Sequence, residues 1–165
     1  MEAAALMCVA FVSLNLQYDD QRLERACNHM LEIIAETKGT KIKPEILLSL
    51  IHYESRWKPK AVSRAGACGL TQVIPRYTGN VKEGIPKLTC NQLKDPKTSI
   101  KYGARILRRW INKYGKGSVD KGLCGYNAGY RCKGTSSYSR KVRRLAYKIK
   151  RKMDKIKLRD QIYYE

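Results

Sequence analysis

Apolar residues recur at helical spacing along most of the chain, and this pattern limits the fold more than any other feature of the sequence. Intervals of three and four residues place side chains on one face of a helix. The first run predicts an amphipathic helix that stops at Gly39. Its apolar positions are Leu23, Ala26, Cys27, Met30 and Ile34. Pro44 suits the first turn of the next helix, where a missing N–H costs little. One face of that helix holds Leu47, Leu50, Ile51 and Glu54.

Residues 58–94 interrupt the helical pattern, because they contain most of the glycine and proline. They predict loops, short turns or a small hairpin. Asp95 and Pro96 then predict the start of a second strong helix, with Asp95 as its N-cap. Further helices are expected from about Ser118 to Tyr126 and from about Ser137 onward. The fold class is therefore mainly α, with one loop-rich segment.

The charge balance favours polyanionic partners. The 165 residues suggest one domain, and 34 Lys and Arg against 14 Asp and Glu give a formal net charge of +20. Such a charge attracts nucleic acid, anionic membranes or the acidic polymers of a bacterial envelope.

The six cysteines leave two alternatives open, three disulfides or buried free thiols. They are Cys8, Cys27, Cys68, Cys90, Cys124 and Cys132. No CxxC pair, zinc-ligand spacing or HExxH pattern occurs. The sequence therefore predicts no catalytic metal and no cofactor.

The N-terminal residues 1–40 are expected to form a helical segment packed on the core. Ala3 to Leu16 is mostly apolar, but it is shorter than the roughly 20 residues of a membrane span. A signal peptide or an anchor is the alternative, although Glu2 precedes the apolar run in place of the usual Lys or Arg.

Glu54 is the candidate catalytic group. Helical spacing places it on the apolar face one turn beyond Leu50, where burial would raise its pKa and keep it protonated for general acid work. The alternative is a structural ion pair with one of the many cations. Two loop motifs favour catalysis: "GACGLTQ", which ends in Gln72, and "GYNAG", where Tyr126 and Asn127 are expected on a tight turn. Amides and phenols on small-residue loops suit sugar hydroxyls and N-acetyl groups.

Three stretches together resemble the catalytic domain of soluble lytic transglycosylases, glycoside hydrolase family 23. They are "ESRWKPKAVSRAGACGLTQVIP", "LKDPKTSIKYGARIL", and "GYNAG" followed by "YSRKV", within about residues 42–145. The resemblance implies an α+β lysozyme-like fold in which the segment 58–94 flanks a substrate groove. It also implies cleavage of the β-1,4 bond between N-acetylmuramic acid and N-acetylglucosamine in peptidoglycan, with formation of a 1,6-anhydro ring.

The resemblance also assigns the site residues. The family's catalytic glutamate falls on Glu54. Its substrate-binding positions fall on Ser55, Gln72, Tyr126, Asn127 and Tyr138.

Several positions depart from the family pattern or are hard to assign. Thr71 replaces the usual methionine and Gly125 an alanine, both beside an expected sugar subsite. Cys68 and Cys124 lie inside motifs that require no cysteine. Two alternatives are open for Trp57, a core position and stacking on a sugar, whereas Trp110 is expected in the core.

A single carboxyl is enough for this chemistry if the acetamido group of the substrate acts as the nucleophile, although most glycosidases use two carboxyls. Glu54 would act first as acid and then as base. Asp95 is expected to cap a helix, which leaves Glu83 as the nearest second acid. A hydrolytic, goose-type lysozyme that uses Glu83 to activate water is the close alternative.

The C-terminal residues 148–165 are expected to form a basic helical extension of a catalytic domain spanning residues 41–147. The helix has an apolar stripe, and most of its other residues are Lys or Arg. It could bind an anionic envelope polymer, a membrane surface or nucleic acid, or it could be a solvated face. A basic virion protein with a degenerate enzyme domain is the alternative of another class. A phage virion and a secreted or periplasmic setting are both open.

Overall fold

The computed structural model describes residues 2–163 of the chain, and its mainly α architecture confirms the predicted fold class. The helices in chain order are α1 (Ala3–Val12), α2 (Asp20–Asn28), α3 (Met30–Thr37), α4 (Pro44–Ser55), α5 (Cys90–Leu93), α6 (Pro96–Arg109), α7 (Val119–Ala128) and α8 (Ser137–Tyr163). Short turns of 3-10 or π helix are η1 (Pro75–Tyr77), η2 (Val81–Glu83), η3 (Trp110–Tyr114) and η4 (Gly129–Arg131).

Local sequence signals set several helix starts. Pro44 and Pro96 occupy the first turns of α4 and α6, as predicted. The backbone N–H of Thr98 donates to Asp95 Oδ2 at 2.8 Å, so Asp95 is the N-cap of α6. Ser118 caps α7 in the same way.

The single helix expected before Gly39 is wrong, because the chain forms α2 and α3 with a break at His29. His29 has φ −106° and ψ 11°, outside the helical region. A Cys8–Cys27 disulfide ties α2 to α1, whereas α3 also packs against α4 and α6. The two helices therefore pack against different partners, and the direction of the helix axis changes between them.

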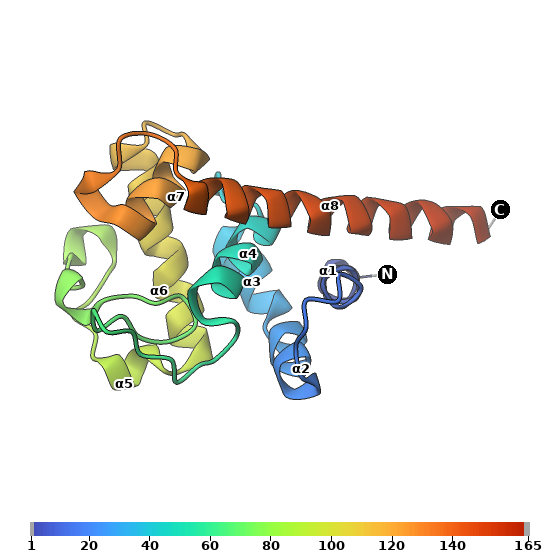
Figure 1. Cartoon of the computed structure of the whole chain (residues 1–165), viewed down its shortest axis with the longest axis horizontal. Helices are drawn as coiled ribbons and strands as arrows, with labels where there is room; N and C mark the ends of the chain where they lie inside the picture. Colours follow the sequence, from blue (N-terminus) through green and yellow to red (C-terminus); the bar gives the residue numbers. More distant parts are fainter. Residues whose placement is uncertain (1, 164–165) are drawn as a thin grey trace.

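The core lies between α1, α3, α4, α6, α7 and α8. Figure 1 shows α8 crossing the compact body and then continuing beyond it, with α1 beneath the projecting part. In α1, the side chains of Leu6, Met7, Ala10 and Phe11 are buried. None of the helices within residues 2–163 combines the length and the apolar character needed to cross a membrane.

Residues 58–89 form loops, turns and minimal β structure, which agrees with the predicted loop-rich segment, and the short helix α5 lies at its end. Isolated antiparallel bridges join Val62 to Cys68 and Cys68 to Val73. A small second core forms beneath them from Cys68, Val73, Leu88 and Leu93. A Cys68–Cys90 disulfide links this loop to the start of α5.

All six cysteines are paired, so the disulfide alternative is confirmed. The third bond joins Cys124 within α7 to Cys132, at a sequence separation of 8.

Candidate active site

Glu54 lies in the last turn of α4, where the chain leaves the helix abruptly. The next residues, Arg56 and Trp57, have φ values of 48° and 62° in the left-handed region, which ends the helix. The Trp57 side chain is 0% exposed and its carbonyl accepts a hydrogen bond from Arg25. Trp57 is therefore a core residue that anchors the helix end, and it does not stack on a sugar.

The carboxyl of Glu54 is largely buried, and Tyr138 of α8 donates a hydrogen bond to its Oε1. Burial raises the pKa of Glu54 from 4.5 to about 7, while the Tyr138 hydrogen bond acts in the opposite direction. The predicted rise in pKa is confirmed. At neutral pH, Glu54 is poised between acid and base.

Tyr126 and Tyr138 bring α7 and α8 to the same carboxyl. The Tyr126 hydroxyl donates to the carbonyl of Thr71 at 2.7 Å. Burial first, and then the charge of Glu54, raise the pKa of both phenols above the ordinary value of 10. Both therefore remain protonated donors throughout the neutral range.

Tyr126 and Asn127 do not lie on a tight turn as expected, because they belong to the last turn of α7, which ends at Ala128 with Gly129 as its C-cap. The hydrogen bond from Tyr126 to Thr71 connects this turn to the opposite loop. Asn127 is exposed. Because the two residues are consecutive in a helix, their side chains point in different directions. Tyr126 points toward the Thr71 loop, and Asn127 points to the solvent.

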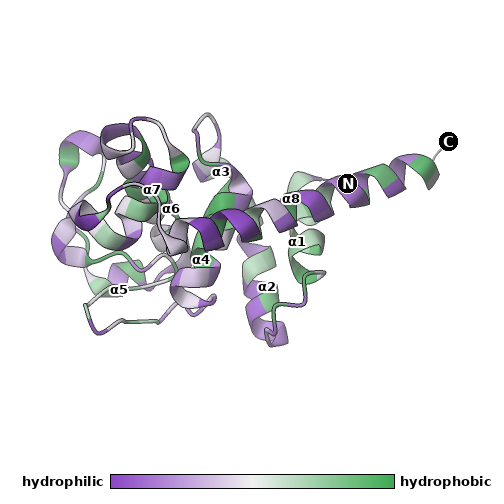
Figure 2. Cartoon of the chain, turned by 45° about the horizontal axis from the view of Figure 1, so that its top comes forward, coloured by the Kyte–Doolittle hydropathy of each residue, from purple (hydrophilic) through white to green (hydrophobic). Residues whose placement is uncertain are grey.

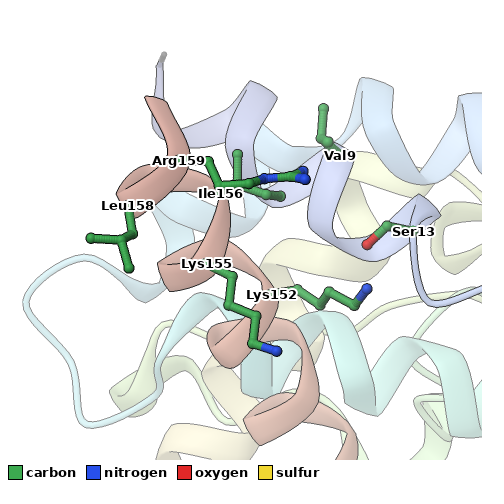
Figure 3. Close-up of a pocket in the computed structure, with 7 residues that line it drawn as sticks. All are labelled: Val9, Ser13, Lys152, Lys155, Ile156, Leu158 and Arg159. Atoms are coloured by element: carbon green, nitrogen blue, oxygen red, sulfur yellow. The ribbon is translucent and has the colours of Figure 1, made fainter. Parts of the chain in front are cut away.

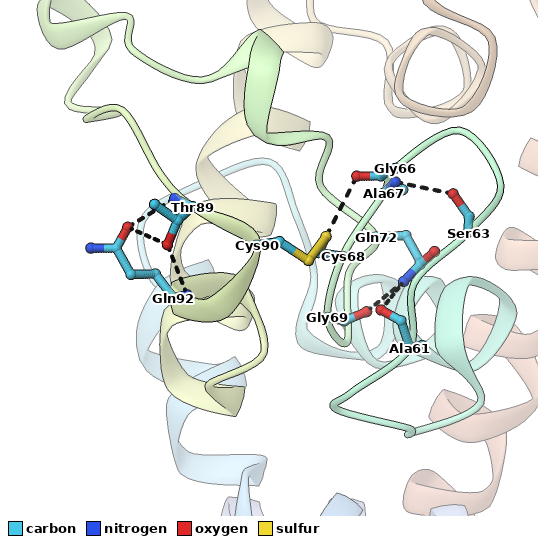
Figure 4. The surroundings of a disulfide bond; sticks show 10 residues. All are labelled: Ala61, Ser63, Gly66, Ala67, Cys68, Gly69, Gln72, Thr89, Cys90 and Gln92. Carbon is cyan, nitrogen blue, oxygen red and sulfur yellow. Dashed lines mark hydrogen bonds between the residues drawn. A yellow bond between two sulfur atoms is a disulfide. The ribbon is translucent and has the colours of Figure 1, made fainter.

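Gln72 is held with its amide group in a defined orientation (Figure 4). Its Nε2 donates to the carbonyls of Gly69 at 2.9 Å and Ala61 at 3.2 Å. Both amide hydrogens are then engaged, so Oε1 is free to accept a hydrogen bond. Gly69 is required here, because a Cβ at this position would meet the Leu93 carbonyl oxygen at 1.9 Å.

The side chain of Ser55 is buried, and its hydroxyl donates to the Ile51 carbonyl at 3.4 Å. Its hydroxyl therefore serves the α4 backbone. The structure thus bonds Tyr138 directly to Glu54 and places Tyr126 close to the same carboxyl, whereas Ser55 is turned into the helix.

The structure gives Thr71, which departs from the family pattern, a structural role, because its side chain is fully buried. Its hydroxyl donates to the Ser99 carbonyl at 2.8 Å and lies 3.0 Å from the Ser99 hydroxyl. A Cβ on Gly103 would approach the Thr71 side chain to 2.4 Å. Thr71 therefore fixes the loop onto α6, while its backbone carbonyl receives Tyr126.

Gly125 is explained by Trp110. A Cβ on Gly125 would come within 2.4 Å of Trp110 Cε3, so the indole ring occupies the space of the missing methyl group. Trp110 is partly exposed rather than fully in the core. It forms an aromatic cluster with Tyr114 and Tyr130, with ring centroids 4.6 and 5.3 Å from the indole. Sequence reasoning missed this cluster, although Tyr130 follows the "GYNAG" motif directly.

Two disulfides support the candidate site from either side. Cys68–Cys90 fixes the loop that carries Gln72, and Cys124–Cys132 joins α7 to the segment that leads into α8. These bonds explain the cysteines inside both motifs.

Other titratable groups near the site have structural partners. Glu83 forms ion pairs with Arg109 at 2.9 Å and Lys113 at 3.7 Å. The Thr98 hydrogen bonds lower the pKa of Asp95. His52 is buried and bonded to the Tyr18 hydroxyl, and burial lowers its pKa to about 4. Within residues 2–163, no group of three or more His, Cys, Asp or Glu side chains is arranged to hold a metal ion.

Comparison with known protein families gives a match over most of the chain. The model of the transglycosylase SLT domain matches residues 32–149. The soluble lytic murein transglycosylase of Escherichia coli (strain K12) is 34% identical over 96 residues, which is 56% of this chain and 15% of that protein. Membrane-bound lytic murein transglycosylase E of Buchnera aphidicola is 30% identical over 100 residues, 56% of this chain and 44% of that protein. The chain thus spans less than half the length of these relatives.

Solved structures show the same fold. An inactive mutant of the lytic transglycosylase Slt from Pseudomonas aeruginosa superposes with a TM-score of 0.68 at 23% identity, covering 87% of this chain and 27% of that one. The 70-kDa soluble lytic transglycosylase in complex with bulgecin A gives a TM-score of 0.56 at 22% identity, covering 87% and 24%. The lysozyme-like fold expected from the sequence is confirmed.

Proposed function

Because the chain belongs to the transglycosylase SLT domain family, we propose that it is a peptidoglycan lytic transglycosylase. It cleaves the β-1,4 bond between N-acetylmuramic acid and N-acetylglucosamine and leaves a 1,6-anhydro-muramic end. The observation that carries this proposal is the largely buried Glu54 carboxyl, which has a pKa of about 7, accepts a hydrogen bond from the Tyr138 hydroxyl and lies close enough to Tyr126 to raise the pKa of that phenol.

In the first step, protonated Glu54 gives its proton to the glycosidic oxygen. The acetamido oxygen of the muramic residue bonds to C1 as the C1–O bond breaks, and the N-acetylglucosamine end leaves as an alcohol. Burial supports this step, because it keeps a carboxyl protonated at a pH where an exposed glutamate would be ionised.

In the second step, the Glu54 carboxylate takes the proton of the C6 hydroxyl. O6 then attacks C1, the bond to the acetamido oxygen breaks, and the anhydro ring closes. Glu54 is protonated again, and no water is consumed. The Tyr138 hydrogen bond stabilises the carboxylate between the steps.

The remaining site residues bind the glycan in this proposal. Gln72 offers an acceptor oxygen to an acetamido N–H or a sugar hydroxyl, since its donors are engaged. Asn127 offers an exposed amide. Tyr126 and Tyr138 enclose the Glu54 carboxyl. Ser55 supports the end of α4 instead of contacting the glycan, because its side chain is buried and its hydroxyl donates to the Ile51 carbonyl.

The setting that fits this reaction is extracytoplasmic, in the periplasm or outside the cell, or within a phage virion that acts on the bacterial wall. Three disulfides support an oxidising environment. We retain as a proposal the division into an N-terminal segment of residues 1–40, a catalytic domain of residues 41–147 and a basic extension of residues 148–165.

The test is mass spectrometry of the products from purified peptidoglycan. Muropeptides one water lighter than reducing ends support the transglycosylase. Reducing muramic ends throughout would identify a hydrolytic lysozyme, and a Glu83→Gln variant would then show whether Glu83 activates the water. The ion pairs of Glu83 with Arg109 and Lys113 favour the transglycosylase, because they hold that carboxylate in a structural contact. An intact protein that releases no product would point to the binding protein with a degenerate domain.

A further inference from the structure

The projecting part of α8 and its neighbour α1 form a surface that the proposed reaction does not use (Figure 1). Within α8, Ile149 is fully buried, whereas Met153 and Ile156 are only partly covered. The contact between α1 and α8 supplies much of this cover. The body of the protein therefore supports the last turns of α8 on one side only.

This surface exposes aliphatic side chains from both helices. Val9 and Val12 of α1 are 46% and 40% exposed, and Leu158 and Ile162 of α8 are 58% and 66% exposed. Residues 3–12 of α1 are apolar on every side, as the hydropathy colours in Figure 2 show. A helix that is apolar all round is normally covered all round, so the exposed side of α1 calls for an apolar partner.

Cations surround these aliphatic groups. Residues 148–163 contain seven Lys or Arg against two Asp, and Asp154 is already paired with Lys150 at 2.5 Å. A groove of about 390 Å³ lies between the helices, and Figure 3 shows Arg159 reaching toward α1 across it. Its lining residues are Val9, Ser13, Lys152, Lys155, Ile156, Leu158 and Arg159.

The combination of charge and aliphatic surface selects among partners. Nucleic acid would match the cations, but exposed aliphatic side chains offer its bases no aromatic stacking. A second copy would match the aliphatic groups, but it would bring one cationic helix against another within a chain of net charge +20. An anionic bilayer matches both, because its phosphates face the cations and its acyl chains receive the aliphatic groups.

We propose that the face formed by α1 and residues 148–163 of α8 docks onto anionic phospholipid bilayers. Leu158, Ile162, Val9 and Val12 enter the boundary between headgroups and acyl chains. Lys152, Lys155 and Arg159 contact lipid phosphates along the groove. The protein then lies on the membrane surface without crossing it, while the candidate active site is carried by the body at the other end of α8.

The test is co-sedimentation of the full chain with vesicles of phosphatidylcholine containing about one quarter phosphatidylglycerol. We expect binding to these vesicles and at least about tenfold weaker binding to phosphatidylcholine alone. Leu158→Glu should weaken binding to the anionic vesicles about tenfold. Leu31→Glu is the matched control, because Leu31 is a 67% exposed leucine on α3 and the change in charge is identical; its binding should stay within about twofold of the unchanged protein.

Other results would overturn the proposal. These are no vesicle binding, equal loss in the two variants, or a duplex DNA affinity that exceeds vesicle binding and is unaffected by Leu158→Glu. Self-association in analytical ultracentrifugation that Leu158→Glu abolishes would identify a second copy as the partner instead. Because both substitutions are at exposed positions, equal far-ultraviolet circular dichroism of the two variants confirms that folding is unchanged.

Discussion

The two ends of α8 both carry polar side chains, but those near the start of the helix are buried and those near its other end are exposed to solvent. Near its start, Tyr138 is enclosed and bonded to Glu54, where burial raises the pKa of the acid and this one hydrogen bond opposes the rise. Near its other end, Lys152, Lys155 and Arg159 extend beside exposed aliphatic groups. Burial makes single polar contacts decisive at the first end, whereas at the second end only the sum of many exposed charges matters. Variants at one end should therefore leave the function of the other end unchanged.

The largest effect is expected for Glu54→Gln. It removes the proposed acid and base, so cleavage of peptidoglycan should fall at least about a thousandfold in a turbidity or product-release assay. Binding to anionic vesicles should be unchanged, because Glu54 lies in the body and not on the docking face. An active variant would refute the assigned role of Glu54, and a parallel loss of vesicle binding would show that the two ends are not independent.

The same variant tests the burial of Glu54 through stability. The folded state raises its pKa from 4.5 to about 7, so the folded state holds the proton more tightly than the unfolded chain does. The wild-type protein therefore loses stability as pH rises from about 4.5 through about 7, by roughly 2–4 kcal/mol for this group. Glutamine carries no such proton. The melting temperature of Glu54→Gln should rise above that of the wild type at about pH 8 and match it near pH 4; equal melting temperatures at both would show that Glu54 is not buried.

The second largest effect is expected from removing a disulfide, and it should differ between the candidate site and the α1–α2 region. Cys68→Ser with Cys90→Ser removes the bond beneath the Gln72 loop, and Cys8→Ser with Cys27→Ser removes the bond between α1 and α2. The sequence separations of 22 and 19 are similar, so each loss should cost about 2–4 kcal/mol in urea denaturation. Only the first pair should raise KM at temperatures where both variants are folded. Equal KM values would mean that the disulfide does not position Gln72.

Sequence reasoning succeeded where the signal is local. Pro44 and Asp95 set helix starts through groups within one turn, and helical spacing correctly placed Glu54 on a buried face with a raised pKa. The resemblance supplied the fold, because its motifs occur in the right order along the chain.

Sequence reasoning failed where contacts between distant segments determine the local structure or the role of a residue. The break at His29 follows from the different neighbours of α2 and α3. Nothing near Thr71 in the sequence explains why it replaces a methionine, whereas in the structure its hydroxyl donates to the carbonyl of Ser99, 28 positions away. The disulfide partners likewise could not be chosen from spacing, since six cysteines allow fifteen pairings.

The third effect concerns packing behind α7. Gly125→Ala places a methyl group in the space of the Trp110 ring, so it should destabilise the protein by about 1–3 kcal/mol. Gly125→Ala combined with Trp110→Leu should recover part of this loss, because the smaller side chain makes room for the methyl group. A thermodynamic cycle of the two variants measures this coupling, and strict additivity would contradict the contact.

The smallest effect is expected for Tyr138→Phe, which removes the proton donated to Glu54 while keeping the ring. That hydrogen bond lowers the pKa of Glu54, so its loss should raise the pKa further above 7. Protonation for the first step then extends to higher pH, whereas the carboxylate needed for the second step is less stable. We expect kcat to fall about tenfold at neutral pH, with the alkaline limb of the pH profile moved upward. Tyr147→Phe is the matched control on the exposed surface of the same helix and should leave both kcat and the profile unchanged. A drop in kcat without a shift of the alkaline limb would mean that Tyr138 acts on the substrate and not through Glu54. The effect of this end of α8 on catalysis would then not depend on the hydrogen bond to Glu54.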